Sequence, residues 1–284
     1  MTNNQTDRTM KAMKLMLAAT VVAMTAACSG PKEEAQKVLV VYYSQLGHTK
    51  AVAEEIAART GADIEEIAMV TPYDTGFSAT IERCMQDREA GVLPEIQPVA
   101  ANVADYDVVF VGFPVWFGTY APPVTKWLEG VDLSGKKVVP FCTFGSGGLE
   151  SSVAELRKCQ PNAEILEGYG VRAARMDAMP KEVEQYLIDA GFVDGEHSVA
   201  VPWGEQHEVS TAEAAVFDAA VDGYPMLNAK AKAVAVRTVA DGMEYLFTAV
   251  NMPREDRPDQ APAEIQVFVI VADGQAPVFT RVVR

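Results

Sequence analysis

Three short stretches of the sequence hold residues that could bind a phosphate group and an aromatic ring. In the first stretch, Ser44–Thr49, a glycine stands among hydroxyl-bearing side chains directly before a predicted helix. The N-terminus of a helix offers unpaired N–H groups and the positive end of a dipole, and Gly47 lets the backbone approach a ligand closely. The stretch therefore predicts a phosphate loop that needs no basic side chain. Taken alone, it fits an ordinary strand-to-helix turn equally well.

The spacing in Ser44–Thr49 disfavours two common nucleotide-binding loops. It does not match GxxxxGK[ST], which binds the phosphates of nucleoside triphosphates. It does not match GxGxxG, which binds dinucleotides, either.

The second and third stretches carry aromatic residues and glycines. Pro114–Thr119 contains Trp116 and Phe117, and an indole or phenyl ring favours offset packing on another aromatic system. Thr143–Gly148 offers backbone amides around Gly145. A ligand with both a phosphate and an aromatic ring would use all three stretches. The alternative for Trp116 is a core residue at the end of a strand.

Each stretch follows a predicted strand. The apolar runs Val38–Tyr43, Val108–Phe113 and Lys137–Cys142 suit parallel strands buried on both faces. Strands alternating with helices predict an α/β fold with a doubly wound parallel sheet, in which ligands lie outside the carboxyl ends of the strands. The other predicted elements are strands at Ala62–Val70 and Ile165–Val171 and helices at Thr49–Thr60, Ser78–Glu89, Pro122–Leu128, Leu149–Cys159 and Pro180–Ala190.

Three segments resemble flavodoxins: VVYYSQLGHTKAVAEEIA, GFPVWFGTYAPPVTKWLE and VVPFCTFGSGG. They are similar in particular to flavodoxin-like domains of exported bacterial lipoproteins. The resemblance implies a five-stranded flavodoxin-like domain over residues 37–194 and one non-covalent FMN. The cofactor-binding residues it implies are Ser44, Gln45, Leu46, Gly47, His48, Thr49, Pro114, Val115, Trp116, Phe117, Gly118, Thr143, Phe144, Gly145 and Gly147. Leu46 and His48 replace the threonine and asparagine usual in the family, so one hydroxyl contact is lost.

The N-terminal residues 1–27 have the pattern of a secretory signal. Arg8, Lys11 and Lys14 precede a short apolar run, Leu15–Ala27. The tetrapeptide TAAC, which ends at Cys28, resembles a bacterial lipobox and implies that Cys28 is lipidated and that residues 28–36 form a tether. We therefore expect an exported, membrane-anchored lipoprotein in the periplasm or on the outer cell surface. The alternative is a plain signal peptide followed by an incidental cysteine.

The pattern changes near residue 195. A predicted helix at Thr211–Ala220 precedes four extended runs, which together indicate a small α+β domain over residues 195–284 with a four-stranded antiparallel sheet. The four runs are Lys230–Val239, Met243–Asn251, Glu264–Val271 and Pro277–Val283. The segment Thr238–Phe247 resembles the central hairpin of cystatin-like domains, whereas the simpler interpretation is a docking or packing module.

Composition narrows the remaining possibilities. The chain has 24 basic and 39 acidic residues and a net charge of −15, which disfavours a nucleic-acid partner. Its four cysteines and three histidines do not show metal-ligand spacing, so no metal site is expected. Cys142 is expected to be a small buried residue, and a Cys142–Cys159 disulfide is not expected.

The sequence thus predicts an FMN-binding protein that acts in electron transfer or as a small flavin oxidoreductase outside the inner membrane. Its redox partner would be another protein or a quinone, and the lipid anchor would be its only link to the membrane. No catalytic residues are predicted, because the flavin itself performs the chemistry. The alternatives are a surface lipoprotein binding module that has lost FMN and a cystatin-type protease inhibitor.

Overall fold

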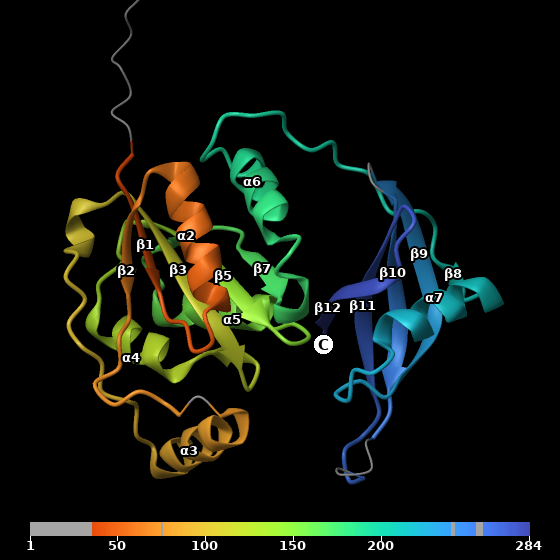
Figure 1. Ribbon diagram of the computed structural model, residues 1–284, viewed down its shortest axis with the longest axis horizontal. Helices are drawn as coiled ribbons and strands as arrows, with labels where there is room; N and C mark the ends of the chain where they lie inside the picture. The colour runs from red at the N-terminus through yellow and green to blue at the C-terminus, as the bar shows by residue number, and fades with distance from the viewer. Residues whose placement is uncertain (1–35, 75, 240–241, 254–257) are drawn as a thin grey trace, which may run out of the picture. The chain divides into compact units, whose positions relative to one another are not determined.

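The computed structural model describes residues 36–74, 76–239, 242–253 and 258–284 (Figure 1). The predicted signal segment and Cys28 lie outside the described residues. Residues 37–284 form one unit of contacts, which contains two sheets with separate hydrophobic cores.

The first sheet is parallel, with the strand order β2-β1-β3-β5-β6. This order confirms the predicted doubly wound α/β fold. Its strands are β1 (Val38–Tyr42), β2 (Asp63–Glu66), β3 (Val108–Trp116), β5 (Lys137–Phe144) and β6 (Glu164–Ile165). A further strand, β7 (Tyr169–Arg172), pairs with β5, and the short β4 (Thr119–Tyr120) folds back on β3.

The last predicted strand of this sheet is divided into β6 and β7. Val138 pairs with Ile165, and Phe141 pairs with Tyr169, so three residues between the two strands face only two residues of β5. One of those two residues is Pro140, which has no N–H group to donate to a neighbouring strand. The parallel ladder is therefore interrupted at this point.

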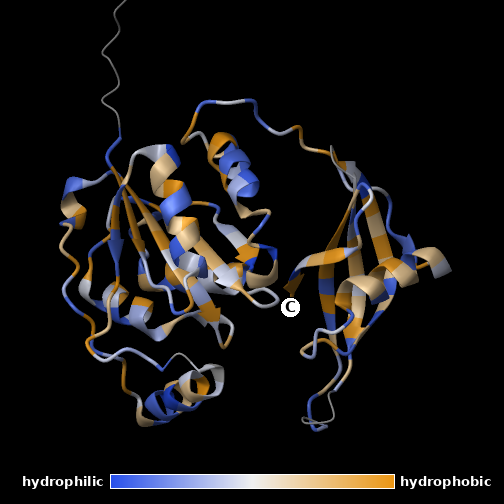
Figure 2. Ribbon diagram, viewed as in Figure 1, coloured by the Kyte–Doolittle hydropathy of each residue, from blue (hydrophilic) through white to orange (hydrophobic). Residues whose placement is uncertain are grey.

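Helices cover both faces of the parallel sheet (Figure 1). On one face lie α2 (His48–Thr60) and α6 (Met179–Asp189), and on the other lie α4 (Pro122–Gly130) and α5 (Leu149–Cys159). Along β3, Val109 and Val111 belong to one core, whereas Val108 and Phe110 belong to the other. This alternation explains why β1, β3 and β5 are mostly apolar, whereas the edge strand β2 is polar and exposed, as Figure 2 shows.

The segment between β2 and β3 contains α3 (Phe77–Ala90) and the 3₁₀ turn η1 (Val103–Asp105). Cys84 anchors α3 in the core on the α4–α5 face of the sheet. A second 3₁₀ turn, η2 (Ala173–Arg175), follows β7 directly.

The second sheet is antiparallel, with the order β12-β11-β10-β9-β8. Four strands confirm the predicted extended runs, and the two-residue β8 (His207–Glu208) adds a fifth strand. The four are β9 (Ala229–Val239), β10 (Gly242–Asn251), β11 (Ala263–Ala272) and β12 (Val278–Val283). The helix α7 (Thr211–Val221) buries Phe217 and Ala220 in the core of this sheet. Residues 240–241 of the predicted hairpin turn lie outside the described residues.

The first turn of α7 is fixed by a capping box. The Ser210 Oγ accepts a hydrogen bond from the N–H of Glu213 (3.3 Å), and the Glu213 carboxylate accepts bonds from the N–H (2.9 Å) and hydroxyl (2.6 Å) of Ser210. The His207 Nε2 lies 2.8 Å from the same carboxylate. These contacts, with the Ser210 hydroxyl first among them, lower the pKa of Glu213 to about 2.

We predict that Glu213→Gln lowers the free energy of unfolding near pH 7 by about 0.5–1 kcal/mol, because the amide keeps an acceptor for the capping box but loses the negative charge at the N-terminus of α7 and beside His207. Because the pKa of Glu213 is about 2 in the folded chain and about 4.3 in the unfolded chain, its contribution is fully present above the higher value. The contribution is lost as the pH falls toward 2. The difference in stability between the two proteins should therefore narrow between pH 4.5 and pH 2.5.

Urea denaturation of the wild type and of Glu213→Gln across pH 7 to 2.5 measures this difference. Glu208→Gln, which removes a carboxylate from the neighbouring strand β8, is the control. A difference in unfolding free energy that stays constant from pH 4.5 to pH 2.5 would contradict the lowered pKa of Glu213.

Candidate functional site

The three predicted binding stretches meet at one edge of the parallel sheet. Val41 pairs with Val111, and Phe113 pairs with Cys142, so β1, β3 and β5 end side by side. The strand order reverses between β1 and β3, because β1 lies between β2 and β3. Such a reversal is the point at which open α/β sheets bind their ligands.

The first loop leads into an α2 terminus that no described side chain caps. Its N-cap residue Gly47 has φ 88°, and a Cβ added there would have no atom within 4 Å. The Gly47 N–H donates to the Ser44 Oγ at 3.1 Å, which fixes the loop before the helix. The first N–H groups of α2 are thus left for an anion, with open space in front of Gly47.

Two side chains of this loop bind protein groups. The Gln45 Nε2 donates to the Asp74 carbonyl at 2.9 Å, and its Oε1 accepts from the Tyr43 hydroxyl at 2.5 Å. The Thr49 Oγ1 lies 2.8 Å from the Thr143 Oγ1 in a buried position, and this contact connects the start of α2 to the end of β5. The side chain of Leu46 is 64% exposed, and His48 is half-buried.

The second stretch differs from the predicted loop. Pro114, Val115 and Trp116 continue β3, because Val115 and Trp116 pair with the short strand β4. Phe117 and Gly118 form the two-residue turn of this hairpin, with φ 52° and 87°. Positive φ at both central residues is the requirement of a type I′ turn. Phe117 is the one non-glycine residue with positive φ in the described part of the chain.

Trp116 lies between two tyrosine rings. Its ring centroid is 6.0 Å from that of Tyr43 and 5.3 Å from that of Tyr73, with interplanar angles of 87° and 68°. Burial, and then the neighbouring Cys84 thiol, raise the pKa of Tyr73. Neither tyrosine was predicted from the sequence to belong to the site. Tyr43 was part of an apolar strand, and Tyr73 stood in an irregular segment without a periodic pattern.

The tip of the hairpin is exposed and contacts α3. Phe117 is 50% exposed, and the Arg88 guanidinium carbon lies 4.9 Å from the centroid of its ring. The same helix places Arg83 over the ring of Tyr73 at 4.6 Å. The segment between β2 and β3 therefore forms one side of the aromatic part of the site.

The third stretch is shorter than predicted, because β5 extends through Thr143 and Phe144. Both side chains are buried, and Phe144 belongs to the core on the α4–α5 face. The loop itself is Gly145–Gly148, which ends at the N-cap of α5. A Cβ on Gly148 would lie 2.5 Å from the Val115 Cγ1, so the second and third stretches are in close contact.

The three described cysteines are free. Cys142 is fully buried, as expected, and burial raises the pKa of its thiol. Cys159 is exposed at the end of α5, and its thiol accepts a hydrogen bond from the Tyr120 hydroxyl at 3.7 Å. A thiol with a raised pKa is a poor nucleophile, so Cys142 is a packing residue.

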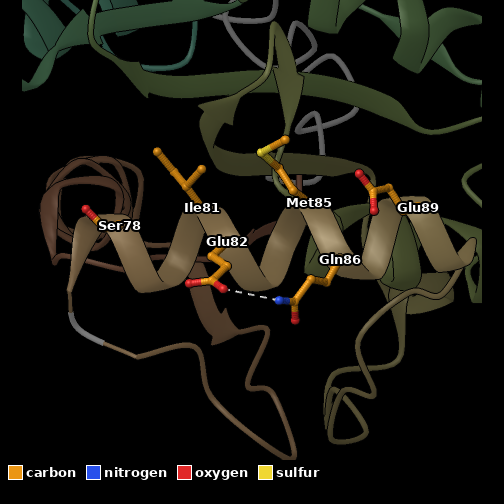
Figure 3. A pocket seen from close by; sticks show the side chains of 6 residues that line it. All are labelled: Ser78, Ile81, Glu82, Met85, Gln86 and Glu89. Atoms are coloured by element: carbon orange, nitrogen blue, oxygen red, sulfur yellow. Dashed lines mark hydrogen bonds between the residues drawn. The ribbon is translucent and has the colours of Figure 1, made fainter.

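A hollow of roughly 390 Å³ runs along α3 (Figure 3). Glu82 and Gln86 hydrogen-bond to each other across one turn, and Ile81 and Met85 project from another side of the helix. All of its lining residues come from α3, so this hollow lacks the convergent loops of a cofactor site. Within the described ranges, no group of three or more His, Cys, Asp or Glu side chains could hold a metal ion.

Comparison with known proteins establishes the family. A family model described as flavodoxin matches residues 37–185, and the chain belongs to the flavodoxin family. Its cofactor is FMN. The residues present fit this group: the uncapped α2 terminus suits a phosphate, the aromatic hairpin suits the ring, and open space lies in front of Gly47 and Gly118.

Curated relatives include two proteins named NAD(P)H dehydrogenase (quinone). The protein from Chromohalobacter salexigens is 29% identical over 136 residues, which are 42% of this chain and 64% of the relative. The protein from Caulobacter vibrioides is 31% identical over 134 residues, which are 41% of this chain and 62% of the relative. The chain thus spans less than two thirds of the length of these relatives.

Solved structures of flavoproteins are also similar. A candidate flavoprotein from Bacteroides eggerthii is 30% identical with a TM-score of 0.47, and the match covers 54% of this chain and 96% of that one. A flavoprotein in complex with FMN from Lactobacillus acidophilus is 24% identical with a TM-score of 0.44, and the match covers 48% and 93% of the two chains.

We predict that Gly47→Ala weakens FMN binding about 5- to 30-fold. An L-residue in the left-handed conformation costs about 1–2 kcal/mol, so the free loop relaxes and must be forced back when the phosphate binds. Titration of FMN fluorescence with apoprotein measures the dissociation constant.

Gly61→Ala is the matched control for this experiment. Gly61 ends the same helix at φ 69°, and a Cβ there also has no atom within 4 Å. Gly61→Ala should lower the free energy of unfolding by about 1–2 kcal/mol, the cost of an L-residue in the left-handed conformation, and leave FMN affinity unchanged. Equal FMN affinities of the two variants would show that the start of α2 does not hold the phosphate.

Proposed function

We propose that this flavoprotein is an FMN-dependent redox protein that exchanges electrons with a quinone outside the inner membrane. The observation that carries the proposal is the meeting of an uncapped helix N-terminus, an aromatic hairpin and a glycine loop at the edge where strand order reverses. The names of the curated relatives support a quinone as partner.

The protein's part in this chemistry is to bind and orient the cofactor. When bound, FMN supplies one- and two-electron transfer through its isoalloxazine ring. The α2 terminus fixes the phosphate, and the Thr49–Thr143 contact keeps that terminus at a set distance from the end of β5. Trp116 makes edge-to-face contacts with Tyr43 and Tyr73, and these contacts fix the position of its ring at the start of the hairpin. The exposed Phe117 leaves the rim of the site accessible to a redox partner.

The electron donor is a separate part of the proposal. The phosphate loop lacks the GxGxxG spacing of dinucleotide-binding proteins. A nicotinamide donor would therefore have to bind in a way that does not use a dinucleotide-binding loop of this type. A protein donor would need only the exposed rim.

We expect the purified chain to be yellow with FMN bound one to one. After anaerobic reduction it should return two electrons per FMN to added benzoquinone, which becomes the hydroquinone. Stopped-flow absorbance measures this transfer, and the same cell tests NADH and NADPH as reductants. Apoprotein is the blank, and free FMN is the reference.

If NADH or NADPH reduces the bound FMN at least tenfold faster than free FMN, the result would support an oxidoreductase of the kind that the relatives' names describe. Quinone exchange without nicotinamide oxidation would support an electron carrier. A colourless chain that cannot be reconstituted with FMN, or a reduced chain that quinone does not reoxidise, would refute the proposal.

We propose further that the chain is an exported lipoprotein anchored through Cys28. The basic residues, short apolar run and TAAC segment of its N-terminus support this. Among the residues that the structure describes, no helix has the length and apolar character needed to span a membrane.

Cys28→Ser should abolish incorporation of labelled palmitate and move the full chain from the detergent phase to the aqueous phase when it is expressed in a bacterium. Cys159→Ser, which removes an exposed thiol of the folded part, should change neither result. An unlabelled wild-type chain, or label retained in Cys28→Ser, would contradict lipid anchoring.

A further inference from the structure

Strand β12 of the second sheet lies directly against the third loop of the flavin site. The Val282 N–H donates to the Ser146 carbonyl at 2.6 Å. A Cβ added to Gly147 would lie 2.1 Å from the Val282 carbonyl oxygen, and one added to Gly145 would lie 2.9 Å from the Tyr224 hydroxyl. The approach of the Gly147 and Val282 backbones requires glycine at position 147.

A buried arginine joins the loop to β12. Arg172, the last residue of β7, is 7% exposed. Its Nε donates to the Gly145 carbonyl and its Nη1 donates to the Phe279 carbonyl, each at 2.8 Å. Its guanidinium carbon lies 3.4 Å from the ring centroid of Phe279 and 5.3 Å from that of Tyr224. One side chain therefore binds a flavin loop, a strand of the second sheet and two aromatic rings.

The burial of this charge has a cost that its partners must offset. Burial lowers the pKa of Arg172, which shows that the surroundings disfavour the charged form. Carbonyl oxygens and aromatic faces stabilise a guanidinium, and its planar fork sets the angle between the two carbonyls it binds. A lysine would have a compact ammonium in place of this fork. The arrangement thus fixes geometry more than it adds stability.

We propose that Arg172 is a positioning residue for FMN and that the second domain, through β12, preorganises the flavin site. Gly145 and Gly147 are held from the side of β12, so the loop amides are already in place when the ring arrives. Preorganisation of a loop raises affinity because the entropy of ordering is not lost on binding. The proposal rests on FMN binding at these three loops, and it gives the second domain a role in cofactor binding.

Arg172→Met in the full chain removes both donors and keeps a side chain of similar length. We expect its dissociation constant for FMN to rise about tenfold, equivalent to about 1.4 kcal/mol. Arg172→Lys should recover part of this loss, because an ammonium can still donate to one of the carbonyls. FMN fluorescence titration of the apoproteins measures the three values.

A second variant covers the case in which Arg172→Met does not fold. Val282→Pro removes the N–H that binds Ser146 but no charge, and proline is tolerated on an edge strand such as β12. Val282→Pro should raise the dissociation constant for FMN, as Arg172→Met does.

Arg281→Met is the matched control. Arg281 lies on the same strand, stacks on Phe268 at 3.9 Å and reaches the exposed Glu150 at 3.5 Å. A surface pair of this kind contributes little, so FMN affinity should be unchanged.

Two readouts separate positioning from a general loss of stability. Hydrogen exchange of residues 144–148 in the apoprotein should be faster in Arg172→Met than in the wild type, while exchange in β1 and β3 is unchanged. At saturating FMN, the visible circular dichroism of the bound flavin should also change.

Loop exchange and FMN affinity equal to wild type in Arg172→Met would overturn the positioning role and leave the FMN site intact. Faster loop exchange with unchanged affinity and unchanged flavin dichroism would overturn it as well. A wild-type chain that binds no FMN would instead refute the flavin site on which the role depends.

Discussion

The parallel pairing of β1, β3 and β5 decides where every candidate flavin residue lies. Each strand contributes alternate side chains to the two cores, so a slip of one residue would exchange the Val109–Val111 face with the Val108–Phe110 face. Helices cover both faces, and side chains exchanged between the two cores would no longer match the neighbours that they pack against. The loops after these strands therefore leave the sheet at fixed positions. Packing in the two cores thus determines how the three loops of the site are arranged.

Several residues at this edge of the sheet have positive φ, and one of them is not a glycine. Gly47 and Gly148 begin α2 and α5 in the left-handed region, and Phe117 adopts it without being a glycine. A residue such as Phe117 costs on the order of 1–3 kcal/mol in that conformation and persists only because the surrounding structure holds it. Helix α7 offers a contrast, since Ser210 and Glu213 cap it fully. Helices α2, α3, α4, α5 and α6 all lack a side-chain cap, so the start of α2 is a candidate anion site only through the loops that meet beside it.

Local patterns in the sequence were sufficient to predict the fold class. Leu149–Cys159 was predicted with the bounds observed, because helical periodicity and a preceding glycine pair are local signals. The extension of β3 to Trp116 was missed, since it depends on pairing with β4 after a turn that places Phe117 at positive φ. Phe144 was assigned to the flavin loop, but pairing with Arg172 keeps it in β5 and its side chain in the core.

Other residues that contact the site were not predicted, because they reach it through long-range contacts. Arg172 and Phe279 are 107 positions apart in the chain, and neither lies in a recognisable motif. Tyr43 and Tyr73 meet Trp116 only after α3 and the sheet are in place. A pattern within one stretch carries no information about such partners. The same limitation hid the role of the second sheet, which its own hairpin sequences could not indicate.

The contact between Arg172 and the third loop has a thermodynamic consequence for both sheets. Coupling between two binding events is reciprocal, so a loop that β12 holds in place for FMN must hold β12 more firmly once FMN is bound. The two effects have the same magnitude, because they close one thermodynamic cycle. Loops are ordinarily the least stable parts of a fold, and a site built only from loops pays for their ordering at each binding event. Arg172 joins Gly145 to β12, which packs on the hydrophobic core of the second sheet. Part of the entropy cost of ordering the loop is therefore incurred when the second sheet folds, before FMN binds.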